Sequence, residues 1–454
     1  MGMDTHIQSI VSWEYARQQQ ELEMIASENY VSKQVMDAYA NVFTNKYSEW
    51  YPGRRYYGWQ VWVDKLELLC QWRALKMFGL VDGDEQDTLN ASWFEALKMS
   101  LKSAEWACNV QPLSGSPANL AVYLWCIEPW DTILWMDLWA WWHLTHGHPL
   151  NASGVFYNIV AYGVTEDTHV IDYEDVKSKA LEHKPAIIIA WFSAYSRKIE
   201  WSEFSKICDK VEEVHGYRPL LLVDMAHVAG LIAWWVYPDP FPHVDIVTTT
   251  THKTLRWPRG GLVFMRKWKL QRNNKEMSLT KLVNRWVFPG IQWWPHEHVV
   301  AAKAVAFKEV IDANFASYAA DVVTNAQALS AELSNKWWSI VSGWTDNHLL
   351  MLDITHRSWE ATWADGKIAE HVLEEVGISC NKNMIPFDTR SPMNPSWIRL
   401  GTSAITTRWL GVDEMKVIAE VIDDALIHHE NPEKLAELKN RIRILCEKFP
   451  LWYD

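Results

Sequence analysis

A lysine that follows a run of threonines is the residue of this chain best suited to covalent chemistry. Thr248 to Thr251 lead into His252 and Lys253, and a short apolar run precedes them. An ammonium group at the end of a buried strand is costly unless it has a use. A lysine that forms an imine with a carbonyl compound works in such a setting. Alone, a lysine after a β-branched strand is usually a surface charge, so the interpretation depends on its neighbours.

An aspartate in another apolar segment is the second candidate. Asp224 lies in the segment Leu222–His227, where it could simply cap the next helix. Alternatively, its carboxylate pairs with a protonated pyridine nitrogen. Pyridoxal phosphate accepts electrons only while its ring nitrogen stays protonated, and an aspartate keeps it so. His227, three residues further on, would then reach the oxygen on the ring.

A helix start follows the segment Asn109–Pro112. Ser116 is a suitable N-cap and Pro117 a suitable first helical residue. Backbone amides at such a start bind phosphate, helped by the helix dipole. The alternative is an ordinary helix start with no ligand.

Two further side chains fit the same kind of site. The histidines of His143–His148 have no acidic or cysteine partner at metal-ligand spacing, so we expect no metal. An imidazole stacked over a flat cofactor fits this segment better. Arg399 could hold a substrate carboxylate as a fork, although most arginines are surface residues.

Three short apolar runs would position these residues. The runs at 186–190, 220–223 and 245–247 read as buried parallel strands. They end at Ser193, at Asp224 and at the pair His252 and Lys253. Ligands of open α/β sheets bind beyond the carboxyl ends of the strands, so the three ends should converge on one crevice.

The domain organisation follows from the same patterns. We expect a helical N-terminal arm over residues 1–30 and a large cofactor-binding domain over 31–300. Within the latter, residues 81–104 read as an inserted loop and helix. Residues 301–454 should form a smaller α+β domain, with a long helix over 301–333, a strand over 349–354 and a helical tail over 433–448.

Composition limits the partners and the compartment. A formal charge of −13 argues against nucleic acid or an anionic membrane as the main partner. The longest stretch without charged residues, 138–164, contains histidines, asparagines and a proline, so it does not read as a membrane span. None of the six cysteines forms a C-x-x-C pair, and residues 1–20 show no signal peptide. We therefore predict a cytoplasmic protein with reduced cysteines.

Together these segments resemble the serine hydroxymethyltransferase family over nearly the whole chain, to about Arg408. Many long matches in the same order are specific, whereas one lysine motif would be weak. The resemblance implies a fold-type I pyridoxal-phosphate enzyme. Such an enzyme has a mainly parallel seven-stranded sheet flanked by helices and a smaller C-terminal α+β domain. The matching motifs are Glu23–Asn29, Asn45–Glu49, Tyr51–Gly58, Asn109–Pro112, Ser114–Asn119, His143–Gly147, Asp224–Gly230, Thr248–Leu255 and Arg399–Arg408.

The resemblance also implies roles in cofactor binding. Lys253 would carry pyridoxal 5'-phosphate covalently, Asp224 would pair with its ring nitrogen, and His227 would bond its phenolic oxygen. His143 would stack on the ring, and Ser193 would touch the cofactor. The residues expected to hold the phosphate are Ser114, Gly115, Ser116 and His252.

The amino acid and the folate would be bound by a further set. Arg399 and Ser27 would hold the amino-acid carboxylate. Tyr47, Glu49 and Tyr57 would reach in from the neighbouring subunit of a homodimer or homotetramer, with Glu49 moving a proton and lying near the folate. The residues expected to contact tetrahydrofolate are Leu138 and Ser391.

The reaction implied is the reversible transfer of the serine hydroxymethyl carbon to tetrahydrofolate, giving glycine and 5,10-methylenetetrahydrofolate. Two alternatives stay open. One is a folate-independent aldolase for β-hydroxy amino acids. The other is an inactive homologue with a blocked pocket.

An excess of tryptophan raises the second alternative. The chain has 30 Trp and 19 Gly, whereas the usual share of glycine would give about 32. Glycine at such positions serves tight turns and close backbone approach, so a dozen tryptophans would cost as much as a domain's stability. We interpret them as a UGA codon that the source organism reads as glycine; a diverged inactive homologue and deliberate engineering are the alternatives. Tryptophan replaces the family's glycine at Trp50, Trp59, Trp141, Trp142, Trp191, Trp235, Trp257, Trp293, Trp294, Trp344, Trp397 and Trp409.

Overall fold

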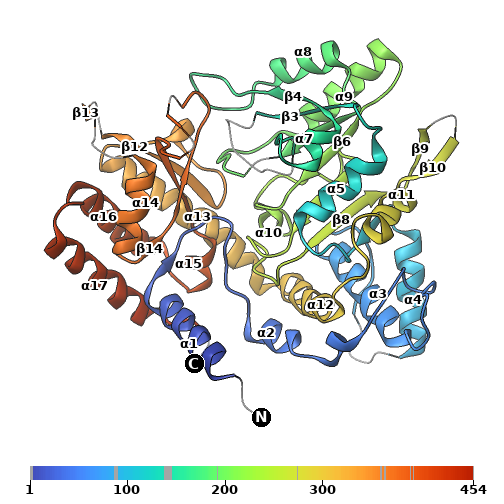
Figure 1. Ribbon diagram of the computed structural model, residues 1–454, viewed down its shortest axis with the longest axis horizontal. Helices are drawn as coiled ribbons and strands as arrows, with labels where there is room; N and C mark the ends of the chain where they lie inside the picture. Colours follow the sequence, from blue (N-terminus) through green and yellow to red (C-terminus); the bar gives the residue numbers. More distant parts are fainter. Residues whose placement is uncertain are drawn as a thin grey trace.

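The larger of the two main sheets has seven strands in the order β2-β8-β7-β6-β5-β3-β4. In the computed structural model (Figure 1), we describe residues 4–85, 90–137, 146–191, 193–272, 275–357, 360–361, 365–388, 390–391 and 393–452. Strands β3 to β7 run parallel, and β8 is antiparallel to both of its neighbours. The strands are β2 (Trp106–Asn109), β3 (Thr132–Met136), β4 (Asn158–Tyr162), β5 (Ile187–Trp191), β6 (Leu220–Asp224), β7 (Ile246–Thr250) and β8 (Gly261–Arg266).

The central strands are apolar on both sides because helices cover both faces of this sheet. Alternate side chains of a strand point to opposite faces. Ile188 and Val223 pack into the cluster beneath α3, α9 and α12, whereas Ile189 and Leu222 pack into the cluster beneath α5 and α11. The helices around this sheet are α2 (Lys33–Tyr39), α3 (Val61–Lys76), α4 (Ala91–Ser103), α5 (Gly115–Cys126), α7 (Ala152–Phe156), α8 (Tyr173–His183), α9 (Trp201–His215), α10 (Ala229–Ile232), α11 (Leu279–Arg285) and α12 (Glu297–Ile311).

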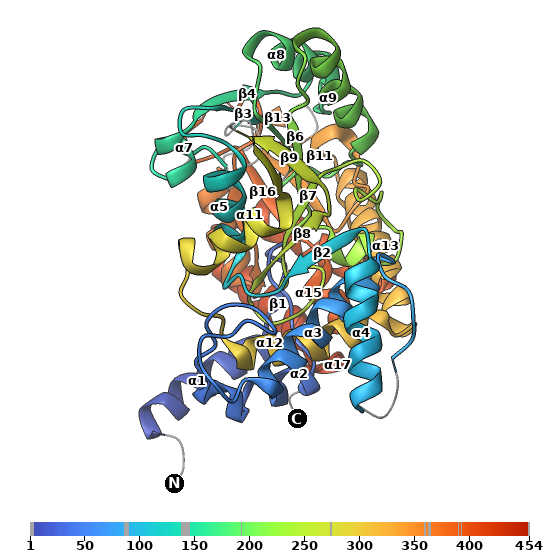
Figure 2. The same ribbon diagram turned by 90° about the vertical axis from the view of Figure 1, so that its right-hand side faces the viewer.

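A second sheet, with the strand order β11-β12-β16-β15, carries Arg399 and is covered by the C-terminal helices. Figure 1 places these elements beside the larger sheet, and Figure 2 shows α2, α3 and α12 together at one end of the molecule. The elements are β11 (Trp338–Ile340), β12 (Leu349–Arg357), β13 (Glu360–Ala361), β15 (Asn381–Asn383), β16 (Trp397–Gly401), α13 (Asn314–Asn335), α14 (Gly366–Glu375), α15 (Ser403–Thr407), α16 (Val412–Ile427) and α17 (Pro432–Lys448).

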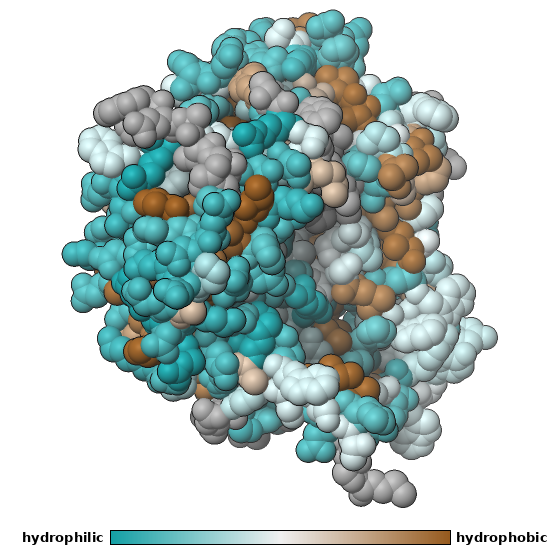
Figure 3. Space-filling view, turned by 60° about the vertical axis from the view of Figure 1, so that its left-hand side comes forward, coloured by the Kyte–Doolittle hydropathy of each residue, from teal (hydrophilic) through white to brown (hydrophobic). Residues whose placement is uncertain are grey.

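Short elements complete the chain. The N-terminal helix α1 (Thr5–Gln20) lies beside α17 (Figure 1), and strand β1 pairs in parallel with β14. The face in Figure 3 is mostly hydrophilic, with separate hydrophobic patches. Among the described residues, no helix is long and apolar enough to cross a membrane. The remaining elements are β1 (Leu22–Glu23), β9 (Lys269–Arg272), β10 (Lys275–Ser278), β14 (Ile378–Ser379), η1 (Val42–Asn45), η2 (Trp286–Ile291) and η3 (Val341–Gly343).

The predicted strands are confirmed as β5, β6, β7 and β12, and the helical tail is confirmed as α17. The single helix expected over 301–333 is wrong, because α12 ends at Ile311 and α13 begins at Asn314. Asp312 leaves the helical conformation with ψ 138°. The break lets α12 pack on α2 and α3, while α13 reaches α16 beside the second sheet.

A buried arginine ties the two ends of the chain together. The guanidinium of Arg408 is fully buried and donates hydrogen bonds of 2.9–3.0 Å to five backbone carbonyls. Three of these carbonyls belong to the end of α1 and two to the end of α17. The acceptors are Gln18, Gln19, Glu21, Cys446 and Phe449.

Replacing Arg408 by methionine will lower the free energy of unfolding by about 3–5 kcal/mol, because five buried carbonyls lose their donor. Arg408→Lys will lose less, since an ammonium still offers three donors. Chemical denaturation measures both. The matched control is Arg443→Met on the exposed side of α17, for which we expect a change within about 0.5 kcal/mol. Equal stability of Arg408→Met and the unchanged chain would contradict a stabilising role for the Arg408 hydrogen bonds.

Among the described residues, six tryptophans have the left-handed backbone conformation that favours glycine. Their φ angles lie between 55° and 72°. A side chain in this region costs about 1–2 kcal/mol. Trp50, Trp59, Trp235 and Trp409 belong to the set where the family pattern has glycine, and Trp130 and Trp337 add two positions. Trp257, from the same set, is buried, and within the described part of the chain its indole Nε1 has no hydrogen-bond partner. These backbone conformations support glycine as the native residue.

Candidate active site

The ends of three parallel strands bring the predicted cofactor residues to one edge of the large sheet. In the register of the sheet, Trp191 pairs with Asp224 and Asp224 pairs with Thr248. Ser193 follows β5 by two residues, and Lys253 follows β7 by three. The predicted convergence of the three strand ends is therefore confirmed.

The side-chain amine of Lys253 is buried and has a lowered pKa. Its side chain is 4% exposed, and burial lowers the pKa of its ammonium to about 8, while the nearby Asp224 charge acts in the opposite direction. Within the described residues, no hydrogen bond occupies its Nζ. Asn29 Nδ2 holds the Lys253 carbonyl at 2.8 Å. A substantial fraction of the amine is therefore neutral and nucleophilic near physiological pH.

The neighbouring Thr254 ties this segment to the turn after β6. Its hydroxyl donates to the His227 carbonyl at 2.9 Å and accepts from the Gly230 amide at 3.0 Å. A Cβ on Gly230 would lie 2.4 Å from the Thr254 carbonyl oxygen, so only glycine allows this approach. The lysine and His227 are thus held on adjoining backbone segments.

Asp224 is fixed by a buried network that the sequence did not reveal. One carboxylate oxygen accepts from the Ala226 amide at 3.0 Å, and the other from Asn119 Nδ2 at 3.0 Å. His146 Nε2 lies 3.3 Å from the same second oxygen. Both Asn119 and His146 stand inside motifs noted above, but no local pattern marked them as partners of Asp224.

Two hydroxyl groups hold Asn119 and His146 in place. Thr248 Oγ1 donates to Asn119 Oδ1 at 2.6 Å, and the Tyr123 hydroxyl bonds His146 Nδ1. Because its supporting groups are themselves bonded, the Asp224 carboxylate is held as a fixed anion beside Lys253.

The predicted phosphate loop lies against the end of β7. Gly115 begins α5, and the Ser114 hydroxyl at the N-cap makes no capping bond. A Cβ on Gly115 would lie 2.8 Å from Thr250 Cγ2. The backbone that leads into this loop is held by the Lys303 ammonium, which donates to the carbonyls of Val110 and Pro112 at 2.9 and 3.2 Å. The first amides of α5 therefore remain open toward an anion.

His252 lies next to the lysine and is poised to donate or accept. Burial and, to a smaller extent, the charge of Lys253 together lower the pKa of its imidazole to about 3. In the described chain, its Nδ1 has no hydrogen-bond partner. An unpartnered buried ring nitrogen beside open helix amides fits a phosphate ester.

Arg399 reaches the same region from the second sheet. Its Nη1 donates to the Ser193 carbonyl at 2.9 Å, and its Nε donates to Asn381 Oδ1 at 2.9 Å. Burial lowers the pKa of its guanidinium to about 10, and its charge acts on Lys253. The remaining guanidinium donors can receive a carboxylate.

Ser27 is held near Arg399 by a close backbone crossing. The Gly401 amide donates to the Met24 carbonyl at 2.7 Å, and a Cβ on Gly401 would lie 2.4 Å from the Ala26 Cα. His348, which we did not predict, lies between the two sheets. Its Nε2 is 3.1 Å from His227 Nδ1, and burial lowers its pKa to about 3.

Tyr47, Glu49 and Tyr57 form a separate group. Within the described residues their side chains contact one another and two tryptophans rather than Lys253. Trp293 Nε1 donates to Glu49 Oε1 at 2.6 Å, and the Trp294 ring lies 4.3 Å from the Tyr47 ring. The Tyr57 and Tyr47 side chains are 48% and 39% exposed. One chain alone therefore does not bring this group to the lysine.

The remaining predicted residues are not joined to the group around Lys253 by a described contact. His143 and Leu138 lie outside the described residues, as do Trp141 and Trp142. Ser391 is exposed, and its carbonyl accepts from the Asn394 amide at 2.9 Å.

The described residues fit pyridoxal phosphate. The amine of Lys253 suits an aldehyde, the fixed carboxylate of Asp224 suits a ring cation, and the open amides at Gly115 suit a phosphate. The chain matches the family model "Serine hydroxymethyltransferase" over residues 1–422. This family consists of fold-type I pyridoxal-phosphate enzymes that transfer the hydroxymethyl group of serine and use tetrahydrofolate, which confirms the predicted fold class and enzyme class. The chain therefore belongs to the serine hydroxymethyltransferase family.

Proposed function

We propose that this chain interconverts serine and tetrahydrofolate with glycine and 5,10-methylenetetrahydrofolate, with pyridoxal phosphate held covalently by Lys253. The observation that carries the proposal is the burial of three groups at one sheet edge. These are the amine of Lys253, the fixed carboxylate of Asp224 and the guanidinium of Arg399. They match an aldehyde, a ring cation and an amino-acid carboxylate.

The cofactor, when bound, supplies an electron sink for the bond that breaks at the amino-acid α-carbon. Asp224 keeps the ring nitrogen protonated, and His227 faces the phenolic oxygen. The amides of Ser114 to Ser116 hold the phosphate with His252, and Ser193 lines the same site. His143 stacks on the ring in this proposal.

The substrates use groups from two copies of the chain. Arg399 and Ser27 hold the amino-acid carboxylate. Tyr47, Glu49 and Tyr57 serve the site of a second copy in a homodimer or homotetramer, because one copy does not bring them to its own lysine. Glu49 moves a proton during the transfer. Leu138 and Ser391 contact the folate.

The tryptophans favour a second candidate, a chain that is inactive as written. The Trp293 indole donates a hydrogen bond to the Glu49 carboxylate, and the Trp294 ring packs against the Tyr47 ring at an interplanar angle of 37°, so both groups are engaged within their own chain. Indole rings at these two positions would compete with the approach of the neighbouring active site. Glycine at 293 and 294 would release both side chains.

Release of glycine from serine, measured with and without tetrahydrofolate, tests the proposal. We expect cleavage that depends on tetrahydrofolate and produces one 5,10-methylenetetrahydrofolate per glycine. Cleavage of β-hydroxy amino acids at equal rates without folate would establish the aldolase instead. No turnover by the chain as written, with turnover after Trp293→Gly and Trp294→Gly, would establish that the tryptophans block the site.

A further inference from the structure

Two glutamates outside the proposed cofactor site are buried against each other. Glu67 lies on α3 and Glu297 is the first residue of α12, and their exposed fractions are 0% and 1%. Burial raises the pKa of Glu297 well above its ordinary value, and the negative charge of Glu67 raises it further. Two buried carboxylates in contact do not both ionise.

The hydrogen bonds identify which of the two carries the charge. Glu67 Oε1 accepts from Arg55 Nη2 at 2.6 Å, and its two oxygens accept from Gln111 Nε2 at 3.2 and 3.0 Å. Neither oxygen of Glu297 accepts a hydrogen bond of normal geometry within the described residues, although the Ser48 hydroxyl lies beside it. A proton on Glu297 makes that carboxyl a donor toward Glu67. The pair then holds one negative charge beside the Arg55 guanidinium, which also pairs with Asp64 at 2.8 Å.

The same network fixes the backbone on both sides of Glu49. Arg55 Nη1 and Gln111 Nε2 donate to the Trp50 carbonyl at 2.7 and 3.0 Å. Ser48, which precedes Glu49, is fully buried beside Glu297. The position of Glu49 therefore depends on groups bonded to the glutamate pair.

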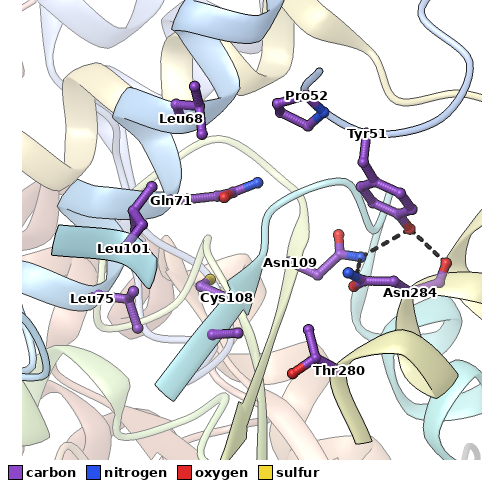
Figure 4. Close-up of a pocket in the computed structure, with 11 residues that line it drawn as sticks. Tyr51, Pro52, Leu68, Gln71, Leu75, Leu101, Cys108, Asn109, Thr280 and Asn284 are labelled. Atoms are coloured by element: carbon purple, nitrogen blue, oxygen red, sulfur yellow. Dashed lines mark hydrogen bonds between the residues drawn. The ribbon is translucent and has the colours of Figure 1, made fainter. Parts of the chain in front are cut away.

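Tyr51 anchors the loop on its other side. Figure 4 shows its hydroxyl directed toward Asn109 and Asn284 beside a cavity of about 220 Å³. The hydroxyl donates to the Asn284 carbonyl at 2.5 Å and accepts from Asn109 Nδ2 at 3.1 Å. The Tyr51 side chain is thus held by neutral groups, whereas the backbone at Trp50 and Gly53 is held by the charged groups Arg55 and Asp64.

We infer that Glu67 and Glu297 share one proton and that this pair positions Glu49 by holding Ser48 and Trp50. The inference rests on the proposed function, in which Glu49 moves a proton. Loss of the proton would add a second negative charge beside the Arg55 guanidinium, which loosens the loop. Other titratable groups that face the pair are Tyr51 from the loop, Asp64 and Cys70 from α3, and Lys303 from α12.

The sign of the pH dependence follows from the raised pKa of Glu297. The folded chain binds this proton more tightly than the unfolded chain, so the contribution of the pair to stability falls as pH rises from about 4.5 through the folded-state pKa. The loop at residues 48–55 should likewise become less ordered as pH rises. Glu297→Gln retains a donor toward Glu67 and removes the titration.

Infrared difference spectroscopy and hydrogen exchange test the pair without requiring activity. We expect the C=O band of a protonated buried carboxyl in the unchanged chain and its loss in Glu297→Gln. Exchange of the amides at 48–55, corrected for the chemical rate, should rise with pH in the unchanged chain and stay constant in Glu297→Gln. The matched control Glu212→Gln, an exposed carboxylate on α9, should retain both signals. The same pH response in Glu297→Gln and the unchanged chain would overturn the inference.

Glu67→Gln separates positioning from folding. This variant removes the charge that Arg55 balances, so we expect a kcat for serine cleavage about tenfold lower with little change in KM, because the pair does not touch substrate. Glu297→Gln should keep kcat. An unchanged kcat in Glu67→Gln would overturn the positioning role. Absence of serine cleavage in every chain, including chains with Trp293→Gly and Trp294→Gly, with the infrared band present, would refute the proposed function and leave the proton pair standing.

Discussion

Lys253→Ala will eliminate covalent cofactor binding and lower serine cleavage by at least about a thousandfold, because no other described amine at the sheet edge can form the imine. Borohydride reduction of the cofactor-loaded chain, followed by peptide mass spectrometry, will place the label on Lys253. Lys303 is the matched control. It is equally buried, and its pKa is also lowered to about 8.

The two lysines differ in what occupies the ammonium. Lys303 donates to three carbonyls, those of Val110, Pro112 and Gly261, whereas no described hydrogen bond occupies Lys253 Nζ. Label on Lys303, or a yellow cofactor complex that survives in Lys253→Ala, would contradict the assignment. Because the pKa of Lys253 is about 8, the rate of cofactor uptake should rise about tenfold between about pH 7 and about pH 9.

Replacing the six left-handed tryptophans by glycine will raise the midpoint of thermal unfolding. At each site the substitution removes about 1–2 kcal/mol of backbone strain from the folded chain. It also costs roughly 0.5–1 kcal/mol, because glycine makes the unfolded chain more flexible. The net gain is about 3–6 kcal/mol, which for a chain of 454 residues corresponds to a shift of about 3–6 °C. The sites are Trp50, Trp59, Trp130, Trp235, Trp337 and Trp409.

Two tryptophans with helical backbone provide the control. Trp13 in α1 and Trp62 in α3 are largely exposed, and glycine there should destabilise the chain by about 1 kcal/mol each. Peptide mass spectrometry of the protein made in its source organism then decides between codon reading and divergence. We expect glycine at the six positions; tryptophan there, or a lower midpoint in the sixfold variant, would end the recoding hypothesis.

The large sheet was predictable because buried parallel strands are apolar without interruption. The apolar run at 220–223 predicted the strand that the structure has as β6, and Asp224 is the first polar residue after this run. The partners of Asp224 were not visible in this way. Asn119 and His146 are 105 and 78 residues away from it in the chain and meet it only in the folded structure, and such contacts leave no local pattern.

Other parts of the site lay beyond a sequence pattern for different reasons. His348 is an isolated histidine before β12, and only the packing of the two sheets brings it to His227. The pairing of Glu67 with Glu297 joins two helices that are far apart in the chain. The group of Tyr47, Glu49 and Tyr57 was assigned to a neighbouring subunit by resemblance, and a single chain leaves this assignment a prediction. The domain boundaries likewise stay predictions.

The pairing of β1 with β14 orders events on the ribosome. Leu22 pairs with Ile378 in this parallel ladder, and Arg408 donates a hydrogen bond to the Gln18 carbonyl near the end of α1. A nascent chain therefore keeps the segment around Leu22 and Ser27 undocked until Ile378 has emerged. The seven-stranded sheet can assemble before that moment. The Ser27 wall of the proposed substrate site consequently closes after the seven-stranded sheet has been synthesised.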